Sequence, residues 1–123
     1  MKLKFTIVLL FILSTIVSFG KDQGYLGVMV TNYDANNLQG ALIKNIFDDG
    51  AAKHSDLKEN DIIVELNNAT INSKDELIAT LKKYAWGDKV KIAYIRDGVT
   101  YNTSMHLGYK AMTKTYDIQE KNY

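Results

Sequence analysis

The stretch Gly24-Tyr25-Leu26-Gly27-Val28-Met29-Val30 decides the fold of this chain. Its two glycines tolerate backbone angles that other residues avoid, so a Gly-x-x-Gly turn can point successive amide N–H groups into one small hollow. Such a hollow can hold a carboxylate without any charged side chain. An apolar strand follows at once, and its edge offers an extended peptide a place to pair. An ordinary glycine turn before a strand is the alternative, because short glycine motifs are weak signals.

The first 20 residues have the pattern of a secretory signal peptide. Lys2 and Lys4 precede an apolar block over residues 5–17, and Ser18-Phe19-Gly20 supplies small residues where a signal peptidase cuts. The sequence therefore predicts cleavage before Lys21 and export to the periplasm or the cell exterior. The apolar block is shorter than the roughly 20 residues that a membrane-spanning helix needs. Retention as an uncleaved membrane anchor is the alternative.

The composition limits what the chain can bind. Removal of residues 1–20, which include Lys2 and Lys4, leaves 103 residues with 13 Lys and Arg against 14 Asp and Glu, a net charge of −1 with His neutral. A chain so close to neutral has no electrostatic attraction to nucleic acid or to an anionic membrane. It has no cysteine, which excludes disulfides and zinc–thiolate sites. About 100 residues can bury one modest core, so we predict one domain over residues 21–108 and a flexible polar tail over 109–123.

Periodicity and turn signals predict an α+β domain. Runs of β-branched and aromatic residues indicate short strands, Ser73 and Glu76 form a capping box that starts a helix, and Asp97-Gly98 is a two-residue hairpin turn. The polar segment 32–40 is predicted to be a connecting loop with little structure of its own. The expected elements are strands over 25–31, 41–47, 62–66, 69–71, 89–95 and 99–107, a helical turn over 51–55 and a helix over 73–84. Such elements predict a small, partly open β-barrel or sandwich of five to six strands that the helix closes on one side.

Several segments, in this order, resemble one family of domains. They are Tyr25-Leu26-Gly27-Val28, Gly40-Ala41-Leu42-Ile43, Gly50-Ala51-Ala52, Leu57-Lys58-Glu59-Asn60-Asp61-Ile62-Ile63, Glu65-Leu66-Asn67-Asn68, the helix over 73–81, Gly87-Asp88-Lys89-Val90 and Ile95-Arg96-Asp97-Gly98. Together they resemble a stand-alone PDZ domain of the bacterial type found in HtrA/Deg proteases, over residues 24–108.

The chain departs from the family at a few turns. The family usually has Gly where this chain has Asp56, Asn60 and Asn68, and Pro where it has Ala51. Asn and Asp are the residues with side chains that best tolerate left-handed backbone angles. We therefore expect the turns to keep their shape.

The resemblance implies binding of the C-terminal end of another polypeptide. The terminal carboxylate would accept hydrogen bonds from the N–H groups of Leu26, Gly27 and Val28, and the peptide would pair antiparallel to the strand that follows. It implies no cofactor and no nucleic acid, and a membrane contact only if residues 1–20 are retained. The partner would be the C-terminal tail or an extended segment of another protein, with a link to a separate protease as one option. The remaining groove residues implied are Tyr25, Met29, Val30, Lys74, Ile78 and Leu81.

Within this groove, an apolar pocket would hold the last side chain of the ligand. Ile78 and Leu81 share one helix face with Lys74, because the three are spaced i, i+4 and i+7. The resemblance implies that Leu26, Val28, Ile78 and Leu81 line this pocket. A plain core role for Ile78 and Leu81 is the alternative.

The sequence does not predict an enzyme. His54-Ser55-Asp56 has the residue types of a catalytic triad, but neighbours in a helical turn point in different directions, and a triad assembles from separated positions. The acidic residues between 48 and 61 do not follow the spacing of a calcium loop, and Asp61 is instead expected to cap turn amides. The alternative function is a structural or interaction protein whose groove binds no free C-terminus and which docks to a partner, or to itself, through a sheet edge.

Overall fold

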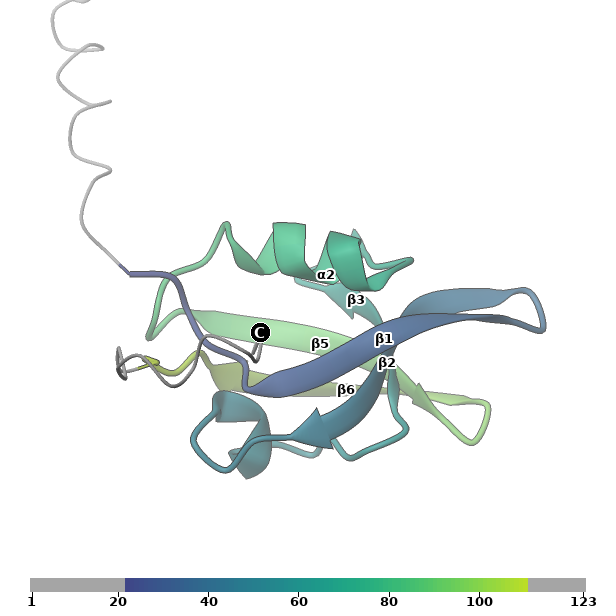
Figure 1. The fold of residues 1–123 in the computed structure, drawn as a ribbon, viewed down its shortest axis with the longest axis horizontal. Coiled ribbons are helices and arrows are strands. Elements are labelled where there is room, and N and C mark those ends of the chain that lie inside the picture. The colour runs from purple at the N-terminus through teal and green to yellow at the C-terminus, as the bar shows by residue number, and fades with distance from the viewer. Residues whose placement is uncertain (1–21, 111–123) are drawn as a thin grey trace, which may run out of the picture.

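The strands join one antiparallel sheet in the order β1-β2-β3-β5-β6, and β4 pairs with β3 beside this path (Figure 1). This computed structural model describes residues 22–110. The sheet does not close into a barrel, and α2 runs along one side of it (Figure 1). The predicted partly open α+β fold is therefore confirmed. The elements are β1 (Val28–Ala35), β2 (Leu38–Ile46), the 3₁₀ helix η1 (Ala51–His54), β3 (Ile62–Leu66), β4 (Ala69–Thr70), α2 (Lys74–Leu81), β5 (Lys89–Arg96) and β6 (Val99–His106).

Two predicted segments lie outside the described residues. They are the signal peptide over residues 1–20 and residues 111–123 of the tail. Within residues 22–110, no helix has the length and apolar character needed to span a membrane.

Strands β1 and β2 form a long hairpin where the sequence predicts a loop over residues 32–40. The prediction is wrong because the strands stay paired as far as Ala35 and Leu38, and only Asn36 and Asn37 make the turn. Both asparagines adopt positive φ angles, 53° and 61°, as a tight two-residue hairpin turn requires. The hairpin projects beyond the rest of the sheet (Figure 1). Its residues are mostly polar because much of the hairpin is exposed to solvent, so their composition resembles that of a loop.

Helix α2 begins where the capping box predicts. Ser73 Oγ accepts a hydrogen bond from the N–H of Glu76 at 3.1 Å, and the two side chains approach to 3.4 Å. The helix ends at Leu81, earlier than the predicted end at Tyr84. The N–H groups of Lys83 and Tyr84 bond the carbonyl three residues back, which is the tighter 3₁₀ pattern that often finishes a helix.

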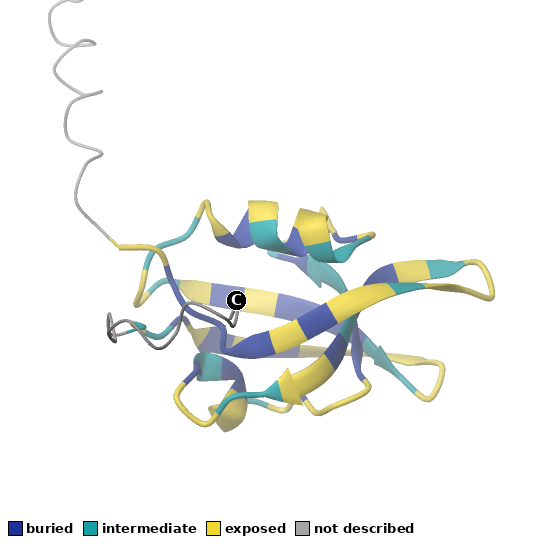
Figure 2. Cartoon of the chain, in the orientation of Figure 1, coloured by how far each residue is buried: buried dark blue, intermediate teal, exposed yellow. Residues whose placement is uncertain are grey.

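The core lies between the sheet and α2. Buried and exposed residues alternate over the first half of β1 (Figure 2), as expected for a strand with one face on the core. The core draws side chains from the loop before β1, from the strands and from α2. Its largest fully buried apolar members are Leu26, Val28, Ile43, Ile63, Leu66, Ile71, Leu77, Leu81, Val90 and Ile92.

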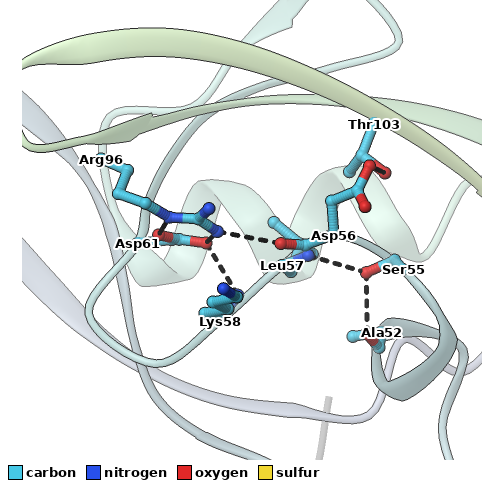
Figure 3. Close-up of polar contacts among 8 residues, drawn as sticks. All are labelled: Ala52, Ser55, Asp56, Leu57, Lys58, Asp61, Arg96 and Thr103. Carbon is cyan, nitrogen blue, oxygen red and sulfur yellow. Dashed lines mark hydrogen bonds and ion pairs between the residues drawn. The ribbon is translucent and has the colours of Figure 1, made fainter.

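An ion pair between buried Asp61 and partly exposed Arg96 connects the end of β5 to the turn before β3. Asp61 is only 1% exposed, and its carboxylate accepts from Arg96 Nε at 2.8 Å and from Arg96 Nη2 at 2.7 Å (Figure 3). It also accepts from the N–H of Lys58 at 2.7 Å, which confirms the predicted turn cap. The hydrogen bond to Asp61 raises the pKa of Arg96 above its ordinary value. The partnership with Arg96, 35 residues away, had no signal in the sequence.

The three residues that stand where the family usually has glycine adopt two kinds of conformation. Asn60 and Asn68 adopt φ angles of 75° and 68°, so these turns keep the left-handed conformation as predicted. Asp56 does not adopt a positive φ. Its carbonyl instead accepts from Arg96 Nη2 at 2.9 Å, and its carboxylate accepts from the hydroxyl of Thr103 at 3.4 Å (Figure 3).

Candidate peptide-binding site

The loop over residues 24–27, the outer edge of β1 and helix α2 form what we call the β1–α2 site. The chain entering the loop is tied down on both sides. The N–H of Gly24 donates to the carbonyl of Tyr84 at 3.1 Å, and Tyr25 and Gly108 exchange two backbone hydrogen bonds of 2.9 and 3.0 Å. The loop is thus held by the end of the α2 segment and by the residues after β6.

Gly27 is required where the loop turns into β1. Its φ is +81°, and a Cβ at this position would lie 2.5 Å from the Cα of Gly50. A Cβ at Gly50 would in turn lie 2.4 Å from the Cα of Gly27. The two backbones are in direct contact, so both the left-handed angle and the absence of side chains are needed here.

The carbonyls of Leu26 and Gly27 are bound to the body of the domain. The carbonyl of Leu26 accepts from the N–H of Ala52 at 2.9 Å, and the carbonyl of Gly27 accepts from the N–H of Phe47 at 2.9 Å. In a trans peptide unit the C=O and the following N–H point in opposite directions, and the described residues contain no cis peptide bond. The N–H of Gly27 therefore points away from η1, and the N–H of Val28 points away from the end of β2.

The same rule applies one unit earlier. The carbonyl of Tyr25 accepts from Gly108, so the N–H of Leu26 points away from that residue. No residue in the range 22–110 accepts a hydrogen bond from the N–H of Leu26 or of Gly27, and both residues are buried. A buried donor without an acceptor costs about 1–3 kcal/mol. An acceptor supplied by a ligand would recover that cost.

The edge of β1 supplies the backbone beside these donors. Among the described strands, β1 pairs only with β2, so its second edge has no strand partner there. Helix α2 lies on that side of β1 (Figure 1). An extended segment added to this edge would therefore lie between β1 and α2, with its end at the loop.

The residues implied for the apolar pocket are mostly buried. Leu26 and Val28 have no exposed surface, and Leu81 is 1% exposed. All three belong to the core cluster, whereas Ile78 is partly exposed. Ile78 is thus the pocket residue that the structure leaves accessible, and the pocket itself stays a prediction.

The other implied groove residues have different surroundings. Val30 is buried, and Met29 is 37% exposed. The Tyr25 ring is buried, and its hydroxyl donates to Asp49 Oδ1 at 3.1 Å. Burial and then the bond to Asp49 raise the pKa of Tyr25 above its ordinary value. Tyr25 is therefore already engaged with Asp49, and a contact with a ligand stays a prediction for it and for Met29.

The far end of the site contains a contact that the sequence did not predict. Asn32 Oδ1 accepts a hydrogen bond from the backbone N–H of Lys74 at 2.8 Å. Lys74 is the first residue of α2, so a side chain of β1 caps the helix across the site. The 42 residues between the partners explain why no local pattern could reveal this bond.

Two surface pockets of about 500 and 410 Å³ lie elsewhere. Both include Leu38, next to the turn of the β1–β2 hairpin, and Ile95 of β5. Neither includes a residue that the sequence analysis placed in the groove.

Two of the three residues considered for catalysis, Ser55 and Asp56, make contacts that stabilise the fold. Ser55 Oγ donates to the carbonyl of Ala52 at 2.7 Å and accepts from the N–H of Leu57 at 3.1 Å. The side chain of Asp56 contacts Thr103. In the part of the chain that the structure describes, no cluster of three or more His, Asp or Glu side chains could hold a metal ion.

Comparison with known proteins supports the resemblance. A family model described as PDZ domain matches residues 24–107. The probable periplasmic DegP-like serine endoprotease of Halomonas elongata is 28% identical over 95 residues, which cover 71% of this chain and 20% of that protein. The protein of the same name from Buchnera aphidicola is 32% identical over 100 residues, which cover 74% of this chain and 21% of that protein. The chain thus spans about a fifth of the length of these relatives.

Solved structures share the fold. The HtrA-type protease AlgW with a tripeptide superimposes with a TM-score of 0.68 at 19% identity, over 85% of this chain and 38% of that one. AlgW with a decapeptide gives a TM-score of 0.66 at 19% identity, over 74% of this chain and 30% of that one. At such identities the likeness establishes the fold and nothing further.

Proposed function

The chain belongs to the PDZ domain family, and we propose that it binds the free C-terminal end of another polypeptide at the β1–α2 site. The terminal carboxylate accepts hydrogen bonds from the N–H groups of Leu26, Gly27 and Val28. The residues before it extend along the outer edge of β1, and the last side chain lies toward Ile78.

One observation carries this proposal. The carbonyls of Tyr25, Leu26 and Gly27 all bond the body of the domain, which turns the next three N–H groups the opposite way. Two of these donors have no acceptor among residues 22–110. A carboxylate is the acceptor that such a cluster of backbone donors favours, and hydrogen bonds to a charged group are each worth about 1.5–3 kcal/mol.

The setting of the protein is part of the proposal. The relatives are named as periplasmic proteases, and residues 1–20 have the pattern of a signal peptide. We place the mature chain in the periplasm or outside the cell, as a binding module without catalytic activity of its own. Its ligands are the tails of other envelope proteins, and a separate protease is a partner of the kind the relatives suggest.

Titration of residues 21–123 with matched peptides tests the carboxylate role. Decapeptides ending in valine, leucine, isoleucine or phenylalanine are prepared with a free and with an amidated C-terminus. We expect dissociation constants of about 10–100 μM for the best free acids, because one added strand buries little surface. Amidation should weaken binding about tenfold or more, since it removes the charge that the donors solvate.

Amide resonances locate the binding. In ¹⁵N-correlated spectra the signals of Leu26 and Gly27 should shift with the free acid and shift much less with the amide at the same concentration. Equal binding of the two peptide forms would refute the proposal. A concentration-dependent dimer in light scattering, with no peptide binding, would favour a structural or interaction protein instead.

A further inference from the structure

Strand β6 is the last strand of the sheet, at the other end of the strand order from β1 (Figure 1). It pairs with β5 over its whole length, Val99–His106, without a bulge. Among the strands that the structure describes, none pairs with its second edge. An open edge of this kind can pair with another chain, and natural proteins usually prevent this with a charged residue, a proline or a bulge. Strand β6 has no Asp, Glu, Lys, Arg or Pro among its eight residues.

Several backbone groups of β6 face this open edge. The Asp97-Gly98 turn has φ angles of 52° and 77°, the type I′ turn in which the two flanking residues exchange both backbone hydrogen bonds. Bonded and non-bonded pairs alternate along an antiparallel ladder, so the N–H and C=O groups of Thr100, Asn102 and Ser104 point away from β5. Within residues 22–110, no backbone hydrogen bond outside the β5–β6 ladder involves these groups. They can therefore pair with an added strand.

Apolar surface lies beside the same edge. Val99 is 51% exposed and Tyr101 is 42% exposed, whereas Thr103 and Met105, further along the same face of the strand, are buried. The Tyr101 ring stacks on the Tyr94 ring with their centroids 5.6 Å apart, so it is held against the sheet with part of its surface exposed. A strand added to β6 would cover both exposed side chains, as cross-strand neighbours do within a sheet.

We propose that a second copy of this chain pairs with β6 in antiparallel orientation, about a two-fold axis at Asn102. In this register Asn102 meets its own copy and Thr100 meets the partner's Ser104, which gives about six backbone hydrogen bonds. The two sheets then continue into each other across the axis. This pairing is independent of the proposed function, because the β1–α2 site lies on the other edge strand.

The absence of charge on β6 favours its own copy as the partner. A two-fold axis brings residues of one strand opposite residues of the same strand, and like charges directly opposite each other destabilise a strand pair. Strand β6 avoids this in every register, since the charged residues of the two paired strands, Lys89, Lys91 and Arg96, all lie on β5. The axis also covers apolar surface on both copies at once, because Val99 faces the partner's Met105.

Self-association of residues 21–123 tests the proposal. Sedimentation velocity between about 10 μM and 1 mM should show a monomer–dimer equilibrium, with a dissociation constant of about 50–500 μM because one strand pair buries a small area. Asn102→Lys places two like charges at the axis and should raise that constant about tenfold or more. Asn45→Lys is the matched control, because Asn45 is also an exposed strand residue but lies on β2. It should change the constant by less than about twofold.

A disulfide across the axis gives a second readout. The chain has no cysteine, so Asn102→Cys carries a single thiol. A bonded antiparallel pair places its two Cα atoms about 5.5 Å apart, which a disulfide can span. Under mild oxidation Asn102→Cys should form a covalent dimer at least about fivefold faster than Asn45→Cys at the same concentration, because pairing brings its thiols together. Circular dichroism of each variant establishes that it is folded.

Saturating free-acid peptide distinguishes the two edges of the sheet. It should leave the dimer intact, because the peptide pairs with β1 and the second copy pairs with β6. A dimer that the peptide disperses, equal dissociation constants for Asn102→Lys and Asn45→Lys, or no self-association of the natural chain up to about 1 mM would each overturn this interface and leave C-terminal binding standing. Absence of peptide binding would overturn the proposed function alone, because the dimer is measured without peptide.

Discussion

The two ends of the β1–α2 site treat their backbone donors in opposite ways. At the loop end, the N–H groups of Leu26 and Gly27 have no acceptor among residues 22–110. At the helix end, the N–H of Lys74 donates to Asn32 and that of Glu76 donates to Ser73. Within residues 22–110, side chains of the domain thus supply acceptors at the helix end and none for these two donors at the loop end.

This difference gives the site a direction. The N-terminus of a helix attracts anions through its free N–H groups and its dipole, so α2 would itself be a candidate for holding a carboxylate. Here that end is capped, and it already carries Asp75 and Glu76 in its first turn. A ligand carboxylate is therefore favoured at the loop, where the donors are unpaired and the segment is built on Gly27.

Gly27→Ala should produce the largest effect, and it acts on the loop end. The new Cβ would lie 2.5 Å from the Cα of Gly50 at a φ of +81°. Left-handed strain and overpacking together should lower the free energy of unfolding by about 3–4 kcal/mol. Urea denaturation measures it.

The matched control for that variant is Gly98→Ala. Gly98 has a φ of +77° and open space around its Cβ position. Gly98→Ala should therefore lower the free energy of unfolding only by the cost of the left-handed backbone angle, about 1 kcal/mol. Equal losses of stability in the two variants would mean that the close contact between Gly27 and Gly50 does not contribute to stability.

Asp61→Ala should have the next largest effect, and it acts away from both ends of the site. It removes the carboxylate that accepts from Arg96 and from the N–H of Lys58, which should cost about 3 kcal/mol because Asp61 is buried. Peptide affinity measured on the folded variant should be unchanged. Asp48→Ala is the control, since its ion pair with Lys53 is on the surface, and it should change stability by less than about 0.5 kcal/mol.

Each cap at the helix end should be worth less than either of these. Asn32→Ala and Ser73→Ala each remove one acceptor from the first turn of α2 and should each lower the free energy of unfolding by about 1 kcal/mol. Asn72→Ala is the control, because Asn72 is exposed and makes no hydrogen bond within residues 22–110. If Asn32→Ala cost no more than Asn72→Ala, the helix end would not be closed in the way we describe.

The comparison also separates what the sequence could predict from what it could not. The Ser73 cap, the Asp97-Gly98 turn and the third strand follow from residues a few positions apart, and the structure confirms all three. The Asn36–Asn37 turn was also local, but two asparagines in a polar run gave no alternation strong enough to mark the flanking strands. The glycine loop was predicted because its chemistry lies in one short stretch.

The missed contacts are long-range. Asn32 reaches Lys74 across 42 residues, and Arg96 reaches Asp61 across 35. Nothing in the neighbourhood of an exposed asparagine or a strand-end arginine distinguishes such a partner from solvent. The closed end of the site, which depends on one of these contacts, could only be found in the folded chain.

Alkaline pH should distinguish the loop end of the site from the helix end. Tyr25 at the loop end can ionise, whereas the Asn32 and Ser73 side chains that cap the helix do not. Burial, and then Asp49, raise the pKa of Tyr25 in the folded protein above the value of about 10 that it has when unfolded. The unfolded chain therefore releases a proton above pH 10 that the folded chain keeps, and stability must fall as the pH rises. One such proton gives a slope of about 1.4 kcal/mol per pH unit.

Tyr25→Phe should remove that slope at the cost of the hydrogen bond to Asp49, about 1 kcal/mol at neutral pH. Tyr94 on β5 lies outside the site and serves as the comparison, because its pKa is also raised by burial. Urea denaturation between pH 7 and 11 should show the slope reduced in Tyr25→Phe and in Tyr94→Phe alike. An unchanged alkaline slope in Tyr25→Phe would mean that this hydroxyl ionises as freely in the folded chain as in the unfolded one, and that the loop end holds its shape without it.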